Sequence, residues 1–157
     1  NSPKRSKRFR FQFSLRTFLV VVLSLGAILG VWVGMVQPIR NQWAAVEPIL
    51  ELGGRVETSP SDIPNWLKRL LPAGQTENIE AVFFDYHKAT DEAVVALEKL
   101  PHLKRLYVEK AQLNSKHLKT IAKLKSLERL SLWDNSNLTN DDLTPLAKLK
   151  NLEVLDM

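Results

Sequence analysis

A repeat of 24 or 25 residues in the second half of the chain is the feature that most constrains its fold. Between residues 102 and 125 the apolar residues recur with two different spacings. The first part ends in the alternation of a short strand with one buried face, and the second part has the three-residue spacing of one side of a helix. Residues 78–101 and 126–150 carry the same pattern, and residues 151–157 begin it again. We therefore predict consecutive strand–helix units.

Two aligned sets of apolar residues define the register of these units. They are Ile79, Leu103, Leu127 and Leu152, and Val82, Leu106, Leu130 and Leu155. One strand–helix unit is too small to bury its own apolar side, whereas stacked units share a continuous core. The predicted fold class is thus α/β, a solenoid with a parallel sheet on its concave face and helices on its convex face.

Polar residues mark the expected helix starts within each repeat. The candidates are Thr90-Asp91, Asn114-Ser115 and Thr139 or Asn140, whose side-chain oxygens can accept a hydrogen bond from a free backbone N–H. Pro145 falls inside the third helical part, so a short or 3₁₀ turn is expected there.

The motif LxxLxLxxNxL, formed by Leu127, Leu130, Leu132, Asn135 and Leu138, resembles the leucine-rich repeat family. The resemblance covers residues 78–157, and it implies that residues 40–77 cap the apolar end of the first unit. The whole arrangement is similar to bacterial single-pass membrane-anchored leucine-rich repeat proteins. The family's usual Asn position holds His87 in the first repeat and Ala111 in the second. We therefore expect its ladder of asparagine hydrogen bonds to be broken.

An uncharged apolar run, FLVVVLSLGAILGVWVGMV at residues 18–36, predicts a transmembrane helix. Nineteen residues in a helix span roughly 28 Å, close to the thickness of a bilayer core. We place the helix at 18–39, after a basic tail at 1–17. A cleaved signal peptide would have a shorter core with small residues at its end, and a buried soluble helix would have a polar face.

Charge predicts how this helix is oriented. Six of the 22 basic residues precede the run and only Arg40 follows it closely, so the N-terminus is expected in the cytoplasm and the repeats outside it. The tail KRSKRFRFQF is expected to lie on anionic lipid. Gly26, Gly30 and Gly34 form a stripe through which two helices could dimerise.

The linking segment 40–77 contains several shorter predicted elements. Residues 40–52 form a helix that Pro48 interrupts or kinks, and residues 55–57 form a short strand. Residues 58–64 form a loop, followed by a helix within IPNWLKRLL that Asp62 or Ser61 caps.

Composition excludes several functional classes. Outside the tail the chain has 16 basic and 17 acidic residues, so its pI of about 9.6 does not indicate nucleic-acid binding. Without cysteine there is no disulfide, thiolate metal site or cysteine nucleophile. No zinc-binding HExxH, phosphate-binding glycine loop or GxSxG occurs, so we predict no catalytic residue, no metal and no cofactor.

The binding residues are predicted on the concave strands, between the positions that the core requires. Large aromatic groups stand there without a need in the core, and arginines lie beside them; such groups commonly anchor protein interfaces. The predicted binding residues are Phe83, Asp85, Arg105, Tyr107, Glu109, Arg129, Ser131 and Trp133.

The predicted function is binding of a protein or envelope component by a membrane-anchored, non-enzymatic repeat protein at the periplasmic side or cell surface. The pattern is unfinished at Met157, so we expect the chain to be a fragment. The alternative is a tether or scaffold for an enzymatic or signalling module beyond the C-terminus, and a structural spacer is a third possibility.

Overall fold

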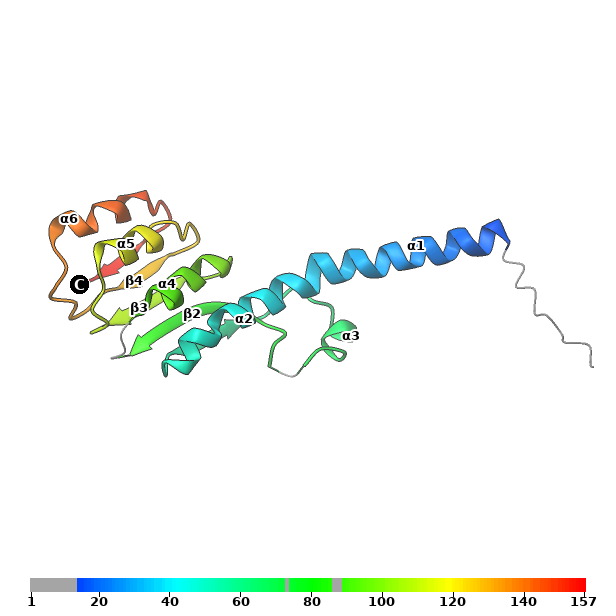
Figure 1. The fold of residues 1–157 in the computed structure, drawn as a ribbon, viewed down its shortest axis with the longest axis horizontal. Helices are drawn as coiled ribbons and strands as arrows, with labels where there is room; N and C mark the ends of the chain where they lie inside the picture. Colours follow the sequence, from blue (N-terminus) through cyan, green and yellow to red (C-terminus); the bar gives the residue numbers. More distant parts are fainter. Residues whose placement is uncertain (1–13, 73, 86–88) are drawn as a thin grey trace, which may run out of the picture.

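The computed structural model describes residues 14–72, 74–85 and 89–157 of the 157-residue chain. It has an α/β architecture with an open five-stranded sheet and one long N-terminal helix that projects from the rest of the chain (Figure 1). Residues 1–13 of the predicted basic tail and His87 at the first Asn position lie outside the described residues. The predicted boundary between tail and helix at residues 17 and 18 is wrong, because the helix begins at Leu15.

The long helix runs without a break from Leu15 to Glu51. It consists of α1 (Leu15–Val31), a π-helical turn (Trp32–Val36) and α2 (Gln37–Glu51). Its first part is long and apolar enough to cross a membrane, and residues 15–30 are exposed along their whole length. A side chain added at Gly26, Gly30 or Gly34 would meet nothing within 4 Å, so the glycine stripe faces open space.

The predicted interruption at Pro48 is wrong. Pro48 lies in the last turn of α2, and the helix continues through it to Glu51. Proline removes one backbone hydrogen bond and crowds the preceding turn. The neighbouring side chains of Val46 and Ile49 are fully buried in the core, and this packing holds the last turn in place. The predicted boundary at residue 39 likewise falls inside the continuous helix.

The sheet has the strand order β1-β2-β3-β4-β5. Its strands are β1 (Arg55–Ser59), β2 (Asn78–Asp85), β3 (Arg105–Glu109), β4 (Arg129–Ser131) and β5 (Val154–Asp156). The last four strands are parallel, and their register follows the sequence repeat, with Val82 opposite Leu106, Leu106 opposite Leu130 and Leu130 opposite Leu155. Strand β1 is antiparallel to β2 and extends two residues beyond its predicted end.

The helices after the strands are short. They are α4 (Asp91–Ala96), α5 (Ser115–Ile121) and α6 (Asn140–Leu143). Their N-caps are Thr90, Asn114 and Thr139, the first residue of each predicted pair. The 3₁₀ turn expected at Pro145 is confirmed, since Thr144–Lys148 is a 3₁₀ helix with the proline in its first turn, where no N–H is required.

The core lies between the sheet and a layer formed by α2, α4 and α5. Leu106 and Leu130 are fully buried at its centre, as are Leu118 and Ile121 of α5. Helix α2 occupies the place beside α4, next to the first repeat. The apolar residues of the repeats therefore fill one shared interior, which explains why two different spacings alternate along the chain.

Gln42 fixes helix α2 to the first parallel strand. Its side chain is 1% exposed, donates from Nε2 to the carbonyl of Glu77 over 2.8 Å, and accepts from the N–H of Ile79 over 3.3 Å. The indole of Trp43 donates to the same carbonyl over 3.2 Å. A buried amide is stable here because both ends of it are bonded.

Helix α3 (Asn65–Lys68) lies beside the long helix, away from the main core (Figure 1). The predicted caps are wrong: Pro64 occupies the N-cap position without a side-chain hydrogen bond. Ser61 instead donates its hydroxyl to the carbonyl of Thr76. Ile63 and Leu67 pack against Val36 and Ile39 of the long helix in a second apolar cluster.

Polar side chains at the helix starts join one unit to the next. Asp91 of α4 accepts from Lys116 and from Nε2 of His117, the latter over 2.8 Å, and both hydrogen bonds lower the pKa of Asp91. Nδ1 of His117 in turn accepts from the N–H of Asn114 over 3.4 Å. His117 is 5% exposed, so it is a bonded structural residue between two helices.

Asp142 makes the matching connection between α5 and α6. From its lowered pKa we predict that the free energy of unfolding falls in acid. The Ser115 hydroxyl, followed by the N–H and hydroxyl of Thr139, lowers the pKa of Asp142 to about 2 from its ordinary value of 3.8. Because the folded pKa is the lower one, the ionised carboxylate stabilises the fold above pH 3.8, and this contribution is lost as the pH falls through about 2. In urea unfolding of the full chain, the advantage of the native protein over Asp142→Asn should shrink over this pH range. An advantage that stays constant would contradict the assignment.

Candidate functional site

The candidate site is the sheet face that α2, α4 and α5 leave uncovered, called here the open face. Strand alternation places Phe83, Tyr107 and Ser131 in one row across β2, β3 and β4. The rings of Phe83 and Tyr107 stack in parallel, with centroids 4.6 Å apart and an interplanar angle of 1°. Both side chains are half-buried, so each ring partly shields its neighbour and still presents an edge to solvent.

Arg55 extends this row onto the antiparallel strand β1. It pairs with Phe83 in the sheet, and its guanidinium lies 5.3 Å from the centre of that ring. Cation, benzene ring and phenol ring thus follow one another across three strands. Sequence reasoning missed Arg55 because it lies outside the repeats, and no repeat position indicates an antiparallel partner strand.

Arg105 bridges two strands over the small side chain of Ala81. Its guanidinium lies 3.0 Å from the carboxylate of Glu57, and Ala81 is paired with both residues in the sheet. Ala81 is therefore fully buried, although it lies in the same row of the open face as Arg105. Arg129 continues the same row and is exposed.

One of the predicted binding residues, Ser131, is buried. It is on the open face but only 2% exposed, because it is a small side chain between larger neighbours, and its hydroxyl lies 3.5 Å from Oε1 of Glu109. Ser131 therefore adds no accessible surface. The backbone of Asp85 pairs with that of Glu109, which places Asp85 beside it in the sheet, while its side chain lies outside the described residues.

Trp133 is the most exposed aromatic residue predicted for the site. It follows β4 directly and is 49% exposed. The ammonium of Lys110 lies 5.1 Å from the centre of its ring and 3.3 Å from the carboxylate of Asp134. The backbone N–H of Lys110 also donates to the carbonyl of Trp133 over 3.1 Å. The ring is thus held at the end of the strand, with part of its surface accessible.

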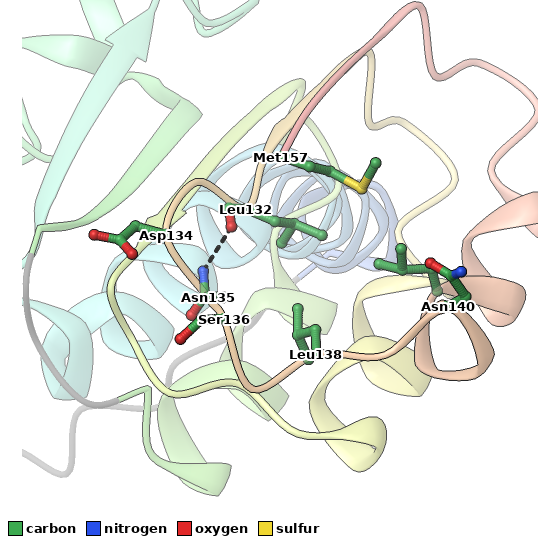
Figure 2. A pocket seen from close by; sticks show the side chains of 8 residues that line it. Leu132, Asp134, Asn135, Ser136, Leu138, Asn140 and Met157 are labelled. Carbon is green, nitrogen blue, oxygen red and sulfur yellow. Dashed lines mark hydrogen bonds between the residues drawn. The ribbon is translucent and has the colours of Figure 1, made fainter.

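A separate pocket of about 290 Å³ lies where the strands end (Figure 2). Its lining residues are Leu132, Asp134, Asn135, Ser136, Leu138, Asn140, Leu143 and Met157. Figure 2 shows that the loop after Leu132 and the end of β5 enclose it from two sides. The lining combines leucine and methionine side chains with two asparagine amides, one serine hydroxyl and one carboxylate.

Asn135 in this pocket bonds several backbone groups of two adjacent units. Its Nδ2 donates to the carbonyls of Val108 and Leu132 over 2.6 and 2.9 Å, and its Oδ1 accepts from the N–H groups of Ala111 and Leu113. Where Ala111 replaces the expected asparagine, its carbonyl accepts from the N–H of Ala89 over 3.1 Å. The single asparagine therefore satisfies the turn of its own repeat and that of the preceding one.

The described residues contain no group of three His, Cys, Asp or Glu side chains arranged to hold a metal ion. His102 is exposed and His117 is used between helices. The open face carries aromatic ring edges, cations and carboxylates, and such groups suit contact with another molecule.

We compared the chain with known proteins, and no protein-family model, curated protein or solved structure matches it.

Proposed function

We propose that this chain is a membrane-anchored leucine-rich repeat protein that binds a protein partner through its open face. Residues 18–36 would cross the membrane with the N-terminus in the cytoplasm, and the repeats would lie on the other side. The function is recognition, without chemistry on the partner.

The repeat architecture is supported by the agreement between sequence period and strand register. Each shift of 24 or 25 residues along the chain moves one strand across the sheet, at the same position of the repeat. Helix α2 lies beside the first unit where a cap would be required, and Gln42 bonds it to β2. These features favour a stacked solenoid capped by residues 40–77.

The anchor is supported by the exposure of an apolar helix. Residues 15–30 contact none of the sheet or its core, and no charge occurs between residues 18 and 36. Exposing so many large apolar side chains to water is unfavourable, whereas lipid accommodates them. The same helix suits a signal anchor and a signal sequence, and we favour the anchor because the helix continues without a break into α2, which packs on the core.

The observation that carries the binding proposal is the row of aromatic and cationic side chains on the open face. The core requires none of Phe83, Tyr107 and Trp133. Phe83 and Tyr107 lie on the open face, and Trp133 follows β4 directly and is 49% exposed. Stacking holds Phe83 and Tyr107 in fixed positions, so little entropy is lost when a partner contacts them.

Site-specific photocrosslinking tests this proposal. A benzophenone amino acid is placed at Tyr107 or at Trp133 of the full chain in its native host. We expect a discrete crosslinked protein from both positions. The matched control position is Val95, which is 47% exposed on α4 at the opposite side of the sheet, and it should give no such product.

Equal crosslinking from Val95 and from the open face, or none from either open-face position, would contradict the binding proposal. Carbonate extraction of the same membranes tests the anchor independently, since a spanning protein stays in the pellet whether or not a partner binds.

A further inference from the structure

An apolar groove lies between the long helix and the segment that contains α3, at the level of the predicted membrane span. Its volume is about 460 Å³. All residues that line it are apolar, and they are Ala27, Ile28, Val31, Trp32 and Val36 of the long helix with Trp66, Leu67, Leu70 and Leu71.

The α3 segment packs against the long helix with one side and leaves two large apolar residues, Trp66 and Leu70, exposed. Ile63 and Leu67 are buried against Val36 and Ile39. In contrast, Trp66 is 60% exposed and Leu70 is 75% exposed. A tryptophan and a leucine exposed side by side indicate a contact surface for an apolar medium.

The position of the groove along the helix identifies that medium. All five helix residues of the groove belong to the charge-free run at 18–36. From Ala27 to Val36 the helix rises about 14 Å, roughly half of a bilayer core. If the run crosses a membrane, Trp66 and Leu70 lie level with the half of the bilayer nearer the repeats. A soluble partner would have to displace lipid to reach them.

Charged and aromatic residues around the groove suit the lipid headgroups. Lys68 and Arg69 follow Leu67 directly, and the guanidinium of Arg40 lies 5.6 Å from the centre of the Trp32 ring. Tryptophan concentrates at membrane interfaces, and lysine and arginine beside it reach toward phosphate groups.

We propose that residues 63–71 are a second membrane contact, in which Trp66 and Leu70 insert between lipids beside the spanning helix. This inference rests on the proposed anchor. Two contacts that do not lie on one line restrict how the long helix rotates about its axis. The sheet, joined to that helix through α2, would therefore be held at a fixed orientation to the membrane, with its open face directed consistently.

Depth measurements on the full chain test the proposal, and the absence of cysteine makes single-site labelling straightforward. The chain is reconstituted in vesicles of phosphatidylcholine and phosphatidylglycerol with an environment-sensitive fluorophore at Leu70→Cys. Ile28→Cys reports on the anchor, and Val95→Cys is the exposed control on α4. We expect lipids with spin labels on their acyl chains to quench positions 70 and 28, and to leave position 95 unquenched.

The outcomes separate the two proposals. Quenching at 28 with an aqueous, unquenched label at 70 overturns the second contact and leaves the anchor standing. An unquenched label at 28 overturns both. A third outcome is a label at position 70 that neither lipid nor water reaches, together with energy transfer between labelled copies. This result would assign the groove to a second copy of the chain and would also overturn the lipid contact.

A second variant tests whether the fluorophore at position 70 enters the bilayer without the segment that carries it. In the Leu70→Cys background, Trp66→Glu places a charge beside the label, and we expect a loss of lipid quenching at position 70. Quenching at 70 that is unchanged by Trp66→Glu would overturn insertion of this segment. The thermal unfolding midpoint of the same variant should stay unchanged, since Trp66 is largely exposed.

Discussion

Replacing Leu106 with alanine should destabilise the repeat unit by about 2–5 kcal/mol, the range measured when a fully buried leucine is truncated. Leu106 is 0% exposed in the middle of the sheet, between Val82 and Leu130 of the adjacent strands. Both neighbours belong to regular strands that cannot move inward independently, so the cavity remains largely open. Urea unfolding of the full chain in mild detergent, followed by tryptophan fluorescence, measures the change.

Leu155 provides the matched control for this substitution. It occupies the same register position on β5 but is 39% exposed. Leu155→Ala should therefore cost only about 0.5 kcal/mol, as for other surface substitutions. Equal losses for the two variants would show that Leu106 is not at the centre of a shared core, and the stacked arrangement would have to be abandoned.

Asn135→Ala is expected to lower the free energy of unfolding by about 3 kcal/mol. The substitution removes both ends of an amide that is 8% exposed, so it leaves the carbonyl of Val108 and the N–H of Ala111 without this partner. Each buried polar group left unsatisfied costs about 1–3 kcal/mol. The same urea unfolding experiment measures the loss.

Asn151→Ala is the control, because Asn151 is an exposed asparagine that also donates to a backbone carbonyl, that of Lys125, over 2.7 Å. We expect a loss of about 0.5–1 kcal/mol there. If Asn135→Ala cost no more than Asn151→Ala, water would be able to replace the asparagine, and its bonds to the preceding repeat would be incidental.

The periodic apolar residues predicted the parallel strands correctly. Val82, Leu106, Leu130 and Leu155 pair as the repeat alignment requires, because in a parallel sheet built from equal units this register places all four on the side of the core. Thr90, Asn114 and Thr139 were likewise predictable as caps, since capping depends on residues within three positions along the chain.

The details of the open face were less predictable. Ser131 and Ala81 occupy outward positions and are nevertheless buried, because exposure depends on the size of neighbours on other strands. Arg55 and Glu57 join the face from a strand outside the repeats, so no period indicates them. Their placement follows from the antiparallel pairing of β1 with β2.

By itself the sequence determined the strand–helix units, their register and the apolar helix, since each depends on periodicity or on an uninterrupted apolar run. Only the tertiary structure decided that α2 continues through Pro48, that Gln42 bonds it to β2, and that α3 lies against the helix. Those features depend on contacts between residues that are distant in the chain. No local pattern records such contacts, because the free energy that favours them arises only when the two surfaces meet.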